Sequence, residues 1–152
     1  GYIAAIKRGF AEATGDVVVT IDADGEFPAG AIPALVAPIE RGEADMVQGA
    51  RDRVPRPSER FLNWLANRVA SVGDSGTGLR ALRVDLARQM EIRGACICGV
   101  FALEAVWRGG RLANVPVRLE RVAKPRRIAW YHLRQLFHLL PWLWRVYRRR
   151  QR

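Results

Sequence analysis

Three carboxylates follow an apolar run in the stretch VVVTIDADGEFP, residues 17–28. Asp22 and Asp24 are two residues apart, and Glu26 continues the spacing. Side chains two apart on an extended segment point the same way, so both aspartates are expected to face one point just past the end of a strand. Two carboxylates repel unless a cation lies between them, and oxygen ligands suit Mg²⁺ or Mn²⁺. The spacing therefore predicts a divalent metal site at Asp22 and Asp24, which Glu26 also approaches; a loop whose acids merely face water is the alternative.

A second group of charged residues lies in the segment ARDRVPRPSER, residues 50–60. It contains Arg51, Arg53, Arg56 and Arg60, interrupted by two prolines. Guanidinium groups match phosphate oxygens in a bidentate way, so this loop is predicted to receive a phosphate group of a substrate. For Arg53 and Arg56 a solvated basic loop is an equal alternative, because runs of charge are usually surface.

The elements that must position these residues read as an α/β fold. Apolar residues at helical spacing predict a helix over 1–13, and the apolar run over 17–21 predicts a buried parallel strand. A helix over 28–42 and a second strand over 44–51 complete a strand, helix, strand unit, which favours a parallel pair with a right-handed crossover. Ligands of such sheets bind at the carboxyl ends of the strands, where Asp22 and Asp24 lie.

The pattern continues with a third helix from Ser58, a plausible N-cap, to residue 69, followed by the glycine-rich GDSGTG. A strand near 79–82 and helices over 84–90 and 99–108 follow. The segment LANVPVRL, residues 112–119, predicts a last strand, which Pro116 restricts to an edge or a bulge. A composition shift near 121–127 separates an α/β body, residues 1–124, from a tail, residues 125–152.

Two kinds of enzyme begin with a strand that runs into paired aspartates. The stretch VVVTIDADG resembles the first motif of haloacid-dehalogenase-type phosphatases, in which Asp22 would be a nucleophile and Asp24 an acid. That family later needs a lysine and a paired acidic motif, and residues 27–120 contain no lysine and no such pair. The phosphatase interpretation therefore lacks most of the catalytic residues that it requires.

The other resemblance extends along the chain. The segments GYIAAIKRGFAEATGDVVVTIDADGEFPAGAIPALV, GEADMVQGAR and GDSGTGLRALR resemble, in order, the second half of a family 2 glycosyltransferase, closest to the dolichyl- or polyprenyl-phosphate mannosyl- and glucosyltransferases. The resemblance implies a GT-A fold, a three-layer αβα sandwich with a mostly parallel sheet, whose first strand and base-binding residues would lie before Gly1. It implies metal and sugar-diphosphate contacts at Asp22, Asp24 and Glu26 and a phosphate contact at Arg51. The family's later signature falls on Asp74, Thr77, Gly78 and Arg80.

The implied reaction moves a hexose, with inversion, from a nucleotide-sugar to a polyprenyl phosphate. A departing diphosphate is stabilised by Mg²⁺ or Mn²⁺ and by nearby arginines, and an anionic phosphate acceptor needs no general base. If the acceptor is instead a sugar hydroxyl of a lipid-linked glycan, Asp74 is the candidate base. A membrane-binding pseudoenzyme is a non-catalytic alternative. Glu104 resembles an acid of the family, but it can equally pair with an arginine and is left outside the catalytic set.

The net charge of +10 is concentrated in the tail. Residues 121–152 hold ten basic and no acidic side chains, whereas residues 1–120 hold fifteen of each. Tryptophan, leucine and terminal arginines are typical of a helix lying in the interface of an anionic membrane, which predicts peripheral attachment at the cytoplasmic face. The longest uncharged run there, QLFHLLPWLW, has ten residues, against about 20 for a spanning helix. A helix that docks on the body is the alternative, and no nucleic-acid recognition motif accompanies the arginines.

The chain has two cysteines, Cys96 and Cys98, and two histidines, His132 and His138. Two cysteines are too few for a disulfide framework, so they are predicted to be reduced, buried thiols. A metal pair is possible, but the sequence places no histidine near the cysteines to complete a tetrahedral site. The histidines lie six residues apart, on different helical faces, which disfavours a metal shared between them.

Overall fold

The computed structural model describes residues 1–54, 56–94, 96–120 and 129–151. The predicted boundary at residue 124 lies outside the described residues, and the side chain of Trp130, one of the tryptophans of the predicted interfacial helix, is not described. The helices are α1 (Tyr2–Glu12), the 3-10 helix η1 (Ala29–Ala31), α2 (Ile32–Glu40), α3 (Pro57–Val69), α4 (Val84–Gln89), α5 (Val100–Trp107) and α6 (Ala129–Arg150). The strands are β1 (Val17–Thr20), β2 (Met46–Arg51), β3 (Arg80–Arg83) and β4 (Leu112–Val117). Every predicted helix and strand is thereby confirmed, within a few residues at its ends.

The strands form a mixed sheet in the order β1-β3-β2-β4. β1 and β2 run in the same direction, but β3 lies between them and is antiparallel to both. Among the strands of the described residues, β2 and β4 form the one parallel pair. The expectation that β1 and β2 pair directly in a mostly parallel sheet is therefore wrong, although the predicted edge position of β4, with Pro116, is confirmed.

β1 also differs from its prediction in burial. All four of its residues are only partly buried, because in the described sheet β1 is an edge strand rather than a central one. Its apolar run, Val17 to Val19, packs at the margin of the core, where Val17 and Val19 contact one hydrophobic cluster and Val18 another. The strand ends at Thr20, one residue earlier than predicted, and so still leads into Asp22.

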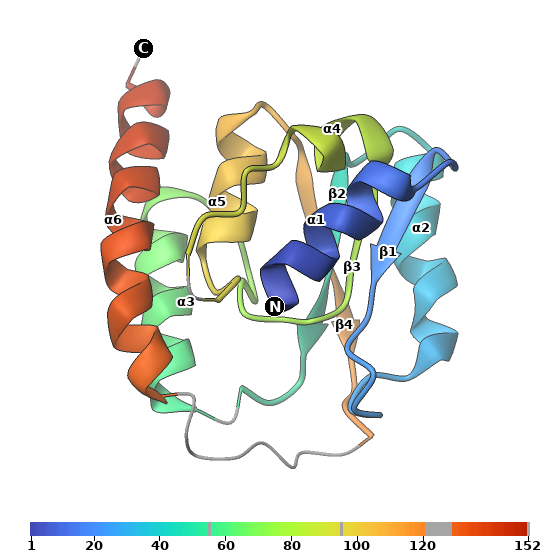
Figure 1. The fold of residues 1–152 in the computed structure, drawn as a ribbon, viewed down its shortest axis with the longest axis horizontal. Coiled ribbons are helices and arrows are strands. Elements are labelled where there is room, and N and C mark those ends of the chain that lie inside the picture. The colour runs from blue at the N-terminus through green and yellow to red at the C-terminus, as the bar shows by residue number, and fades with distance from the viewer. Residues whose placement is uncertain (55, 95, 121–128, 152) are drawn as a thin grey trace.

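Helices cover both faces of the sheet (Figure 1). Alternate residues of the central strands point to opposite faces, so Met46 and Leu82 pack with α1, α4 and α5, whereas Val47 and Ala81 pack with α2. Figure 1 shows α2 on one side of the sheet and α1 on the other. The predicted three-layer arrangement is thus present around a mixed sheet.

A third cluster joins α6 to α3 and α5, outside the sheet (Figure 1). Leu139, Trp142 and Val146 of α6 are buried in it, so the helix docks on the body. The opposite side of α6 exposes Phe137, by 74%, and Trp144, by 58%. The docking alternative is therefore confirmed for the buried face of α6, and membrane contact by the exposed face stays a prediction. Among the described residues no helix is long and apolar enough to span a bilayer.

The start of α3 differs from the prediction. The helix begins at Pro57 with Arg56 as N-cap, and no side chain caps it. Ser58, predicted as the cap, lies in the first turn, and its hydroxyl is 2.7 Å from Nδ1 of His132 on α6. The serine thus joins two helices rather than starting one.

Candidate active site

Two separated motifs meet beyond the end of β1. The carboxylate of Asp22 lies directly against the α-carbon of Gly78, so closely that a Cβ on Gly78 would overlap its oxygens. The hydroxyl of Thr20 donates to the carbonyl of Gly78 at 3.4 Å, which holds the two segments together. A side chain at position 78 would therefore displace this carboxylate.

Two further residues surround Asp22. The hydroxyl of Tyr2 donates to Oδ1 of Asp22 at 3.4 Å, and burial, followed by the charge of Asp22, raises the pKa of Tyr2 to about 12. Arg80 is fully buried beneath this point, with its guanidinium carbon 4.7 Å from the centre of the Phe101 ring. Burial lowers the pKa of Arg80, while the charges of Asp22 and Asp74 oppose that effect.

Arg80 has unused hydrogen-bonding capacity. Its Nη2 makes a long contact of 3.4 Å with the carbonyl of Ser75, while Nε and Nη1 have no hydrogen-bond partner among the described residues. Buried nitrogens of this kind are rare in folded proteins and commonly indicate an absent water, ion or ligand.

Asp24 and Glu26 are placed differently from Asp22. The chain turns at residues 23–24 instead of continuing extended, and Oδ1 of Asp24 accepts the backbone N–H of Glu26 at 3.1 Å. Asp24 is exposed, Asp22 is half-buried and Glu26 is buried. The three side chains are therefore not aligned by strand alternation, and they do not group as a compact set of three ligands within the described residues.

Asp22 and Asp24 nonetheless carry the oxygen donors that a hard divalent cation prefers. Neither carboxylate has an ion-pair partner within 4.0 Å among the described residues, so oxygens of both remain available. Mg²⁺ and Mn²⁺ need only one or two protein carboxylates when waters and phosphate oxygens supply the other ligands. A cavity of about 630 Å³ lies at the other end of β1, beside Thr14, Asp16 and Arg83, and is separate from this site.

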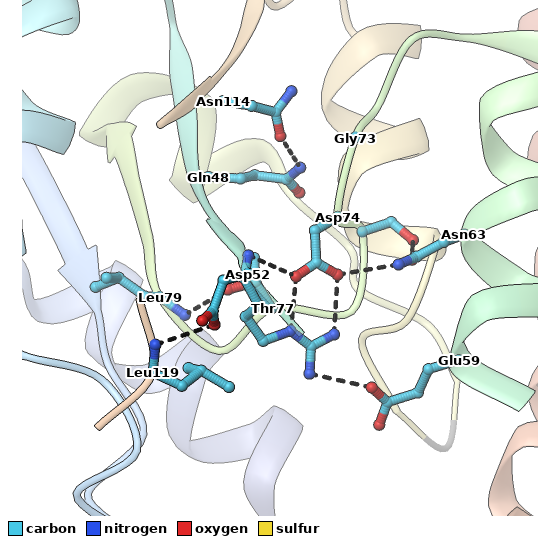
Figure 2. Close-up of polar contacts among 12 residues, drawn as sticks. Gln48, Asp52, Glu59, Asn63, Gly73, Asp74, Thr77, Leu79, Asn114 and Leu119 are labelled. Carbon is cyan, nitrogen blue, oxygen red and sulfur yellow. Dashed lines mark hydrogen bonds and ion pairs between the residues drawn. The ribbon is translucent and has the colours of Figure 1, made fainter. Parts of the chain in front are cut away.

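A buried polar network lies behind this site. Arg51, at the end of β2, makes two hydrogen bonds to the carboxylate of Asp74, of 2.6 and 2.8 Å, and an ion pair of 3.0 Å with Glu59. The amide of Asn63 donates to Asp74 at 3.0 Å. Figure 2 shows Asp74 and Glu59 facing one guanidinium group, with Asn63 beside Asp74. The network ties β2, α3 and the loop before β3 together.

The charges in this network reinforce each other. Burial alone would raise the pKa of Asp74, but hydrogen bonds and attraction from Arg51, with the Asn63 amide, hold it below its ordinary value. Burial would lower the pKa of Arg51, and the two carboxylates raise it above its ordinary value instead. Asp74 is thus held as a carboxylate and Arg51 as a cation, each largely satisfied by the other.

Of the remaining predicted site residues, two arginines are exposed, whereas the others have contacts within the protein. Arg53 and Arg60 are exposed and have no partner among the described residues, so their guanidinium groups are free to meet a ligand. Arg56 instead joins the network through Glu59. Thr77 is buried, and its hydroxyl accepts the backbone N–H of Leu79 at 3.3 Å, which shapes the turn that presents Gly78.

Glu104 has a structural role. It is fully buried, pairs with Arg108 at 2.7 Å, and accepts the backbone N–H groups of Glu91 and Ile92 at 2.7 and 2.9 Å. Ile92 has a φ of 45°, which the carboxylate helps to hold. Its exclusion from the catalytic set agrees with these contacts.

Sequence reasoning missed Glu59, Asn63 and Tyr2. Glu59 and Asn63 are four residues apart on α3 and so share a face, a spacing that could have been noticed directly after the arginine-rich loop. Tyr2 carries no such signal, because it reaches Asp22 only through the packing of α1.

Comparison with known proteins decides the family. The model of Glycosyl transferase family 2 matches residues 1–104, which include Asp22, Asp24, Gly78 and Arg80. The chain belongs to glycosyl transferase family 2. This membership excludes the phosphatase interpretation of the aspartates and accords with the resemblance found in the motifs.

Relatives of this family 2 chain include the undecaprenyl-phosphate 4-deoxy-4-formamido-L-arabinose transferases of Salmonella paratyphi B and Salmonella newport. Each is 39% identical over 90 residues, a match that covers 55% of this chain and 27% of the relative. The chain thus spans about a quarter of the length of these curated relatives.

Solved structures show the same GT-A-like fold. Glucosyl-3-phosphoglycerate synthase from Mycobacterium tuberculosis superimposes with a TM-score of 0.66 at 26% identity, covering 93% of this chain and 54% of that one. Its complex with Mn²⁺, UDP-glucose and phosphoglyceric acid gives a TM-score of 0.70 at 21% identity, covering 91% and 53%. The family 2 chain spans about half the length of these solved chains.

A Gly78→Ala variant of this family 2 chain is expected to lose sugar-transfer activity by at least about tenfold while remaining folded. The new methyl group overlaps the end of a half-buried side chain, so Asp22 must swing aside rather than the backbone. Activity and thermal unfolding measured together check this. Gly30→Ala is the matched control, because nothing lies within 4 Å of an added Cβ there. Full activity in Gly78→Ala would contradict a functional role for the position of Asp22.

Proposed function

We propose that this chain forms part of the catalytic domain of an inverting glycosyltransferase that moves a hexose from a nucleotide-sugar to a polyprenyl phosphate. The observation that carries the proposal is the meeting of Asp22 with Gly78 above the buried Arg80. Two motifs 56 residues apart thereby bring the Asp22 carboxylate and the incompletely hydrogen-bonded Arg80 guanidinium together, with Asp24 two residues further along the chain.

The donor diphosphate is the ligand that fits these groups. Asp22 and Asp24 would hold Mg²⁺ or Mn²⁺, and this ion would supply Lewis-acid stabilisation of the departing diphosphate. Manganese and UDP-glucose are bound in the solved complex of glucosyl-3-phosphoglycerate synthase. Arg80 adds positive charge beneath the site, where low polarity strengthens its effect. Because Gly78 has no side chain, it leaves room for the Asp22 carboxylate at this position.

Asp74 and Arg51 support the site rather than react in it. The Asp74 carboxylate is bound by Arg51 and Asn63 and its pKa is held low, which weakens it as a proton acceptor. A phosphate acceptor needs no such base, because its oxygen is already anionic. The network therefore favours an anionic acceptor over a sugar hydroxyl, with Arg53 and Arg60 as the exposed groups that meet it.

A lipid acceptor accords with the apolar surface. A groove of about 310 Å³ between α3 and α6 is lined by Phe61, Leu62, Leu133 and Leu136. The first two of these residues directly follow Arg60 in the chain. Phe61 and Trp64 are about half exposed and stack on each other with ring centres 5.8 Å apart. The Salmonella relatives are named for undecaprenyl phosphate. We infer that the prenyl chain approaches along this surface.

The test is a transfer assay with the full-length protein that carries this sequence. Labelled nucleotide-sugars, Mn²⁺ and undecaprenyl phosphate are incubated together, and label entering the organic phase is the expected result. Label found only on a lipid-linked glycan would support the sugar-hydroxyl alternative, and label found only on 3-phosphoglycerate would support a small phosphorylated acceptor. Membrane binding without any turnover would support the pseudoenzyme.

Peripheral attachment at the cytoplasmic face predicts a second result. Replacing both Phe137 and Trp144 by Ser is expected to weaken binding to vesicles of anionic lipid by at least about tenfold, because their exposed apolar surface is lost. Vesicle co-sedimentation at low and high salt measures it, and salt weakens the contribution of the terminal arginines. Tyr2→Ser is the control, since this half-exposed aromatic lies on α1. Unchanged binding of the double variant would contradict membrane contact by α6.

A further inference from the structure

Outside the candidate active site, three potential metal ligands from distant parts of the chain come together. The ligand atoms of Cys96, Cys98 and His132 all lie within 4.8 Å of one another. They form the one such group of three among the described residues. The sequence-based expectation that no histidine lies near the cysteines is therefore wrong, because α6 folds back and brings His132 to them.

The spacing within the group suits a tetrahedral ion. Zinc–sulfur bonds of about 2.3 Å and zinc–nitrogen bonds of about 2.0 Å at tetrahedral angles put sulfur and nitrogen about 3.5 Å apart. The Sγ of Cys98 and Nε2 of His132 are 3.8 Å apart. His132 and Cys98 are buried and Cys96 is partly buried, so water competes little for the site.

The surroundings of the group hold each ligand in place. Nδ1 of His132 lies 2.7 Å from the hydroxyl of Ser58, which fixes the ring and leaves Nε2 turned to the cysteines. Metal-binding histidines usually have such a partner on the second ring nitrogen. Gln135, one turn along α6, donates to the carbonyl of Cys96 at 2.7 Å and accepts its N–H at 3.1 Å. His132 and Gln135 of α6 thus both contact the loop that carries Cys96 and Cys98.

We propose that Cys96, Cys98 and His132 bind one Zn²⁺ ion, with Ser58 positioning the imidazole. Two thiolates and one imidazole are the donors that zinc prefers, unlike the carboxylates at Asp22 and Asp24. The described residues supply three ligands, which leaves the fourth position to water or a small anion. The ion would link the loop before α5 to the start of α6, and so would fasten this amphipathic helix to the body.

The first test is the metal content of the untagged protein. After loading with Zn²⁺ in the presence of excess Mg²⁺ and dialysis, one zinc per chain is expected. X-ray absorption should show two sulfurs at about 2.3 Å and one nitrogen at about 2.0 Å. Absence of retained zinc, or a shell of oxygen and nitrogen alone, would overturn the proposal and leave only a thiol–imidazole hydrogen bond.

Variants distinguish this site from others in the chain. Cys96→Ser is expected to weaken zinc binding at least about 100-fold, and Ser58→Ala about 10–100-fold. His138→Gln is the matched control, because it removes the other histidine of α6, which is exposed. Asp24→Asn should retain zinc. Added zinc is expected to raise the melting temperature of the wild type and of His138→Gln but not of Cys96→Ser.

The outcome stays decisive even if Cys96→Ser does not fold, since Ser58→Ala and the wild-type absorption spectrum report on the same site. Equal zinc affinity in Ser58→Ala and wild type would contradict the positioning role of Ser58. Loss of zinc in His138→Gln would place the ion elsewhere on α6 and overturn the proposal.

Discussion

Replacing Asp22 or Asp24 by Asn is expected to lower the rate of sugar transfer by about 10²–10³-fold, the usual cost of losing one group that stabilises transition-state charge. Each substitution keeps the size of the side chain but removes the negative charge that would hold the divalent ion. Stability should change little, since Asp24 is exposed and neither carboxylate has an ion-pair partner among the described residues. Initial rates at several Mn²⁺ concentrations, together with thermal unfolding, measure both effects.

Asp85→Asn is the matched control for this prediction. Asp85 is an exposed aspartate in the first turn of α4, directly after β3, and it pairs with Arg83 at 2.9 Å. Its loss should leave transfer unchanged. Undiminished activity in both Asp22→Asn and Asp24→Asn would remove the basis of the proposed metal site.

Replacing Asp74 by Ala is expected to destabilise the fold by about 3–5 kcal/mol, because it leaves the buried Arg51 guanidinium without its bidentate partner. The side chains of Arg51 and Asp74 are 1% and 6% exposed, so water cannot replace the lost carboxylate. Denaturant unfolding measures the change. Glu43→Ala, which breaks an ion pair with Arg41 on the open surface, should have little effect. An equally small effect for Asp74→Ala would show that the network is not structural.

The same carboxylate makes stability depend on pH. The pKa of Asp74 is lower in the folded state than its ordinary 3.8, so its contribution is fully present above that value. As the pH falls through the folded-state pKa, the carboxylate is protonated and the contribution is lost. Below about pH 3.8, Asp74→Ala should therefore lose less stability than the wild type with each further fall in pH.

The sequence predicted the elements well because each has a local signal. The apolar stripes of α2 and α3 and the glycine at position 42 mark helices and an end without reference to the rest of the fold. Strand order has no such signal. The insertion of β3 between β1 and β2 depends on pairing between Val18 and Leu82, 64 residues apart, and no periodicity reveals that choice.

For the candidate site, the sequence predicted which residues take part but not which of them touch. Asp22 and Gly78 could be named from their motifs, but their direct contact is a product of the strand pairing. Arg51 and Asp74 look like independent ligands in the sequence, and only the fold shows that each satisfies the other. His132 lies 34 residues from Cys98, so its approach could be found only from the docking of α6.

The most direct test of the central claim is the position of Mn²⁺ in crystals of the full-length protein grown with a nucleoside diphosphate. Anomalous scattering is expected to place the ion within about 2.5 Å of a carboxylate oxygen of Asp22 or Asp24, bridging to the diphosphate beside Gly78. A manganese peak remote from both aspartates, or nucleotide bound with no ion between it and Asp22, would contradict the account.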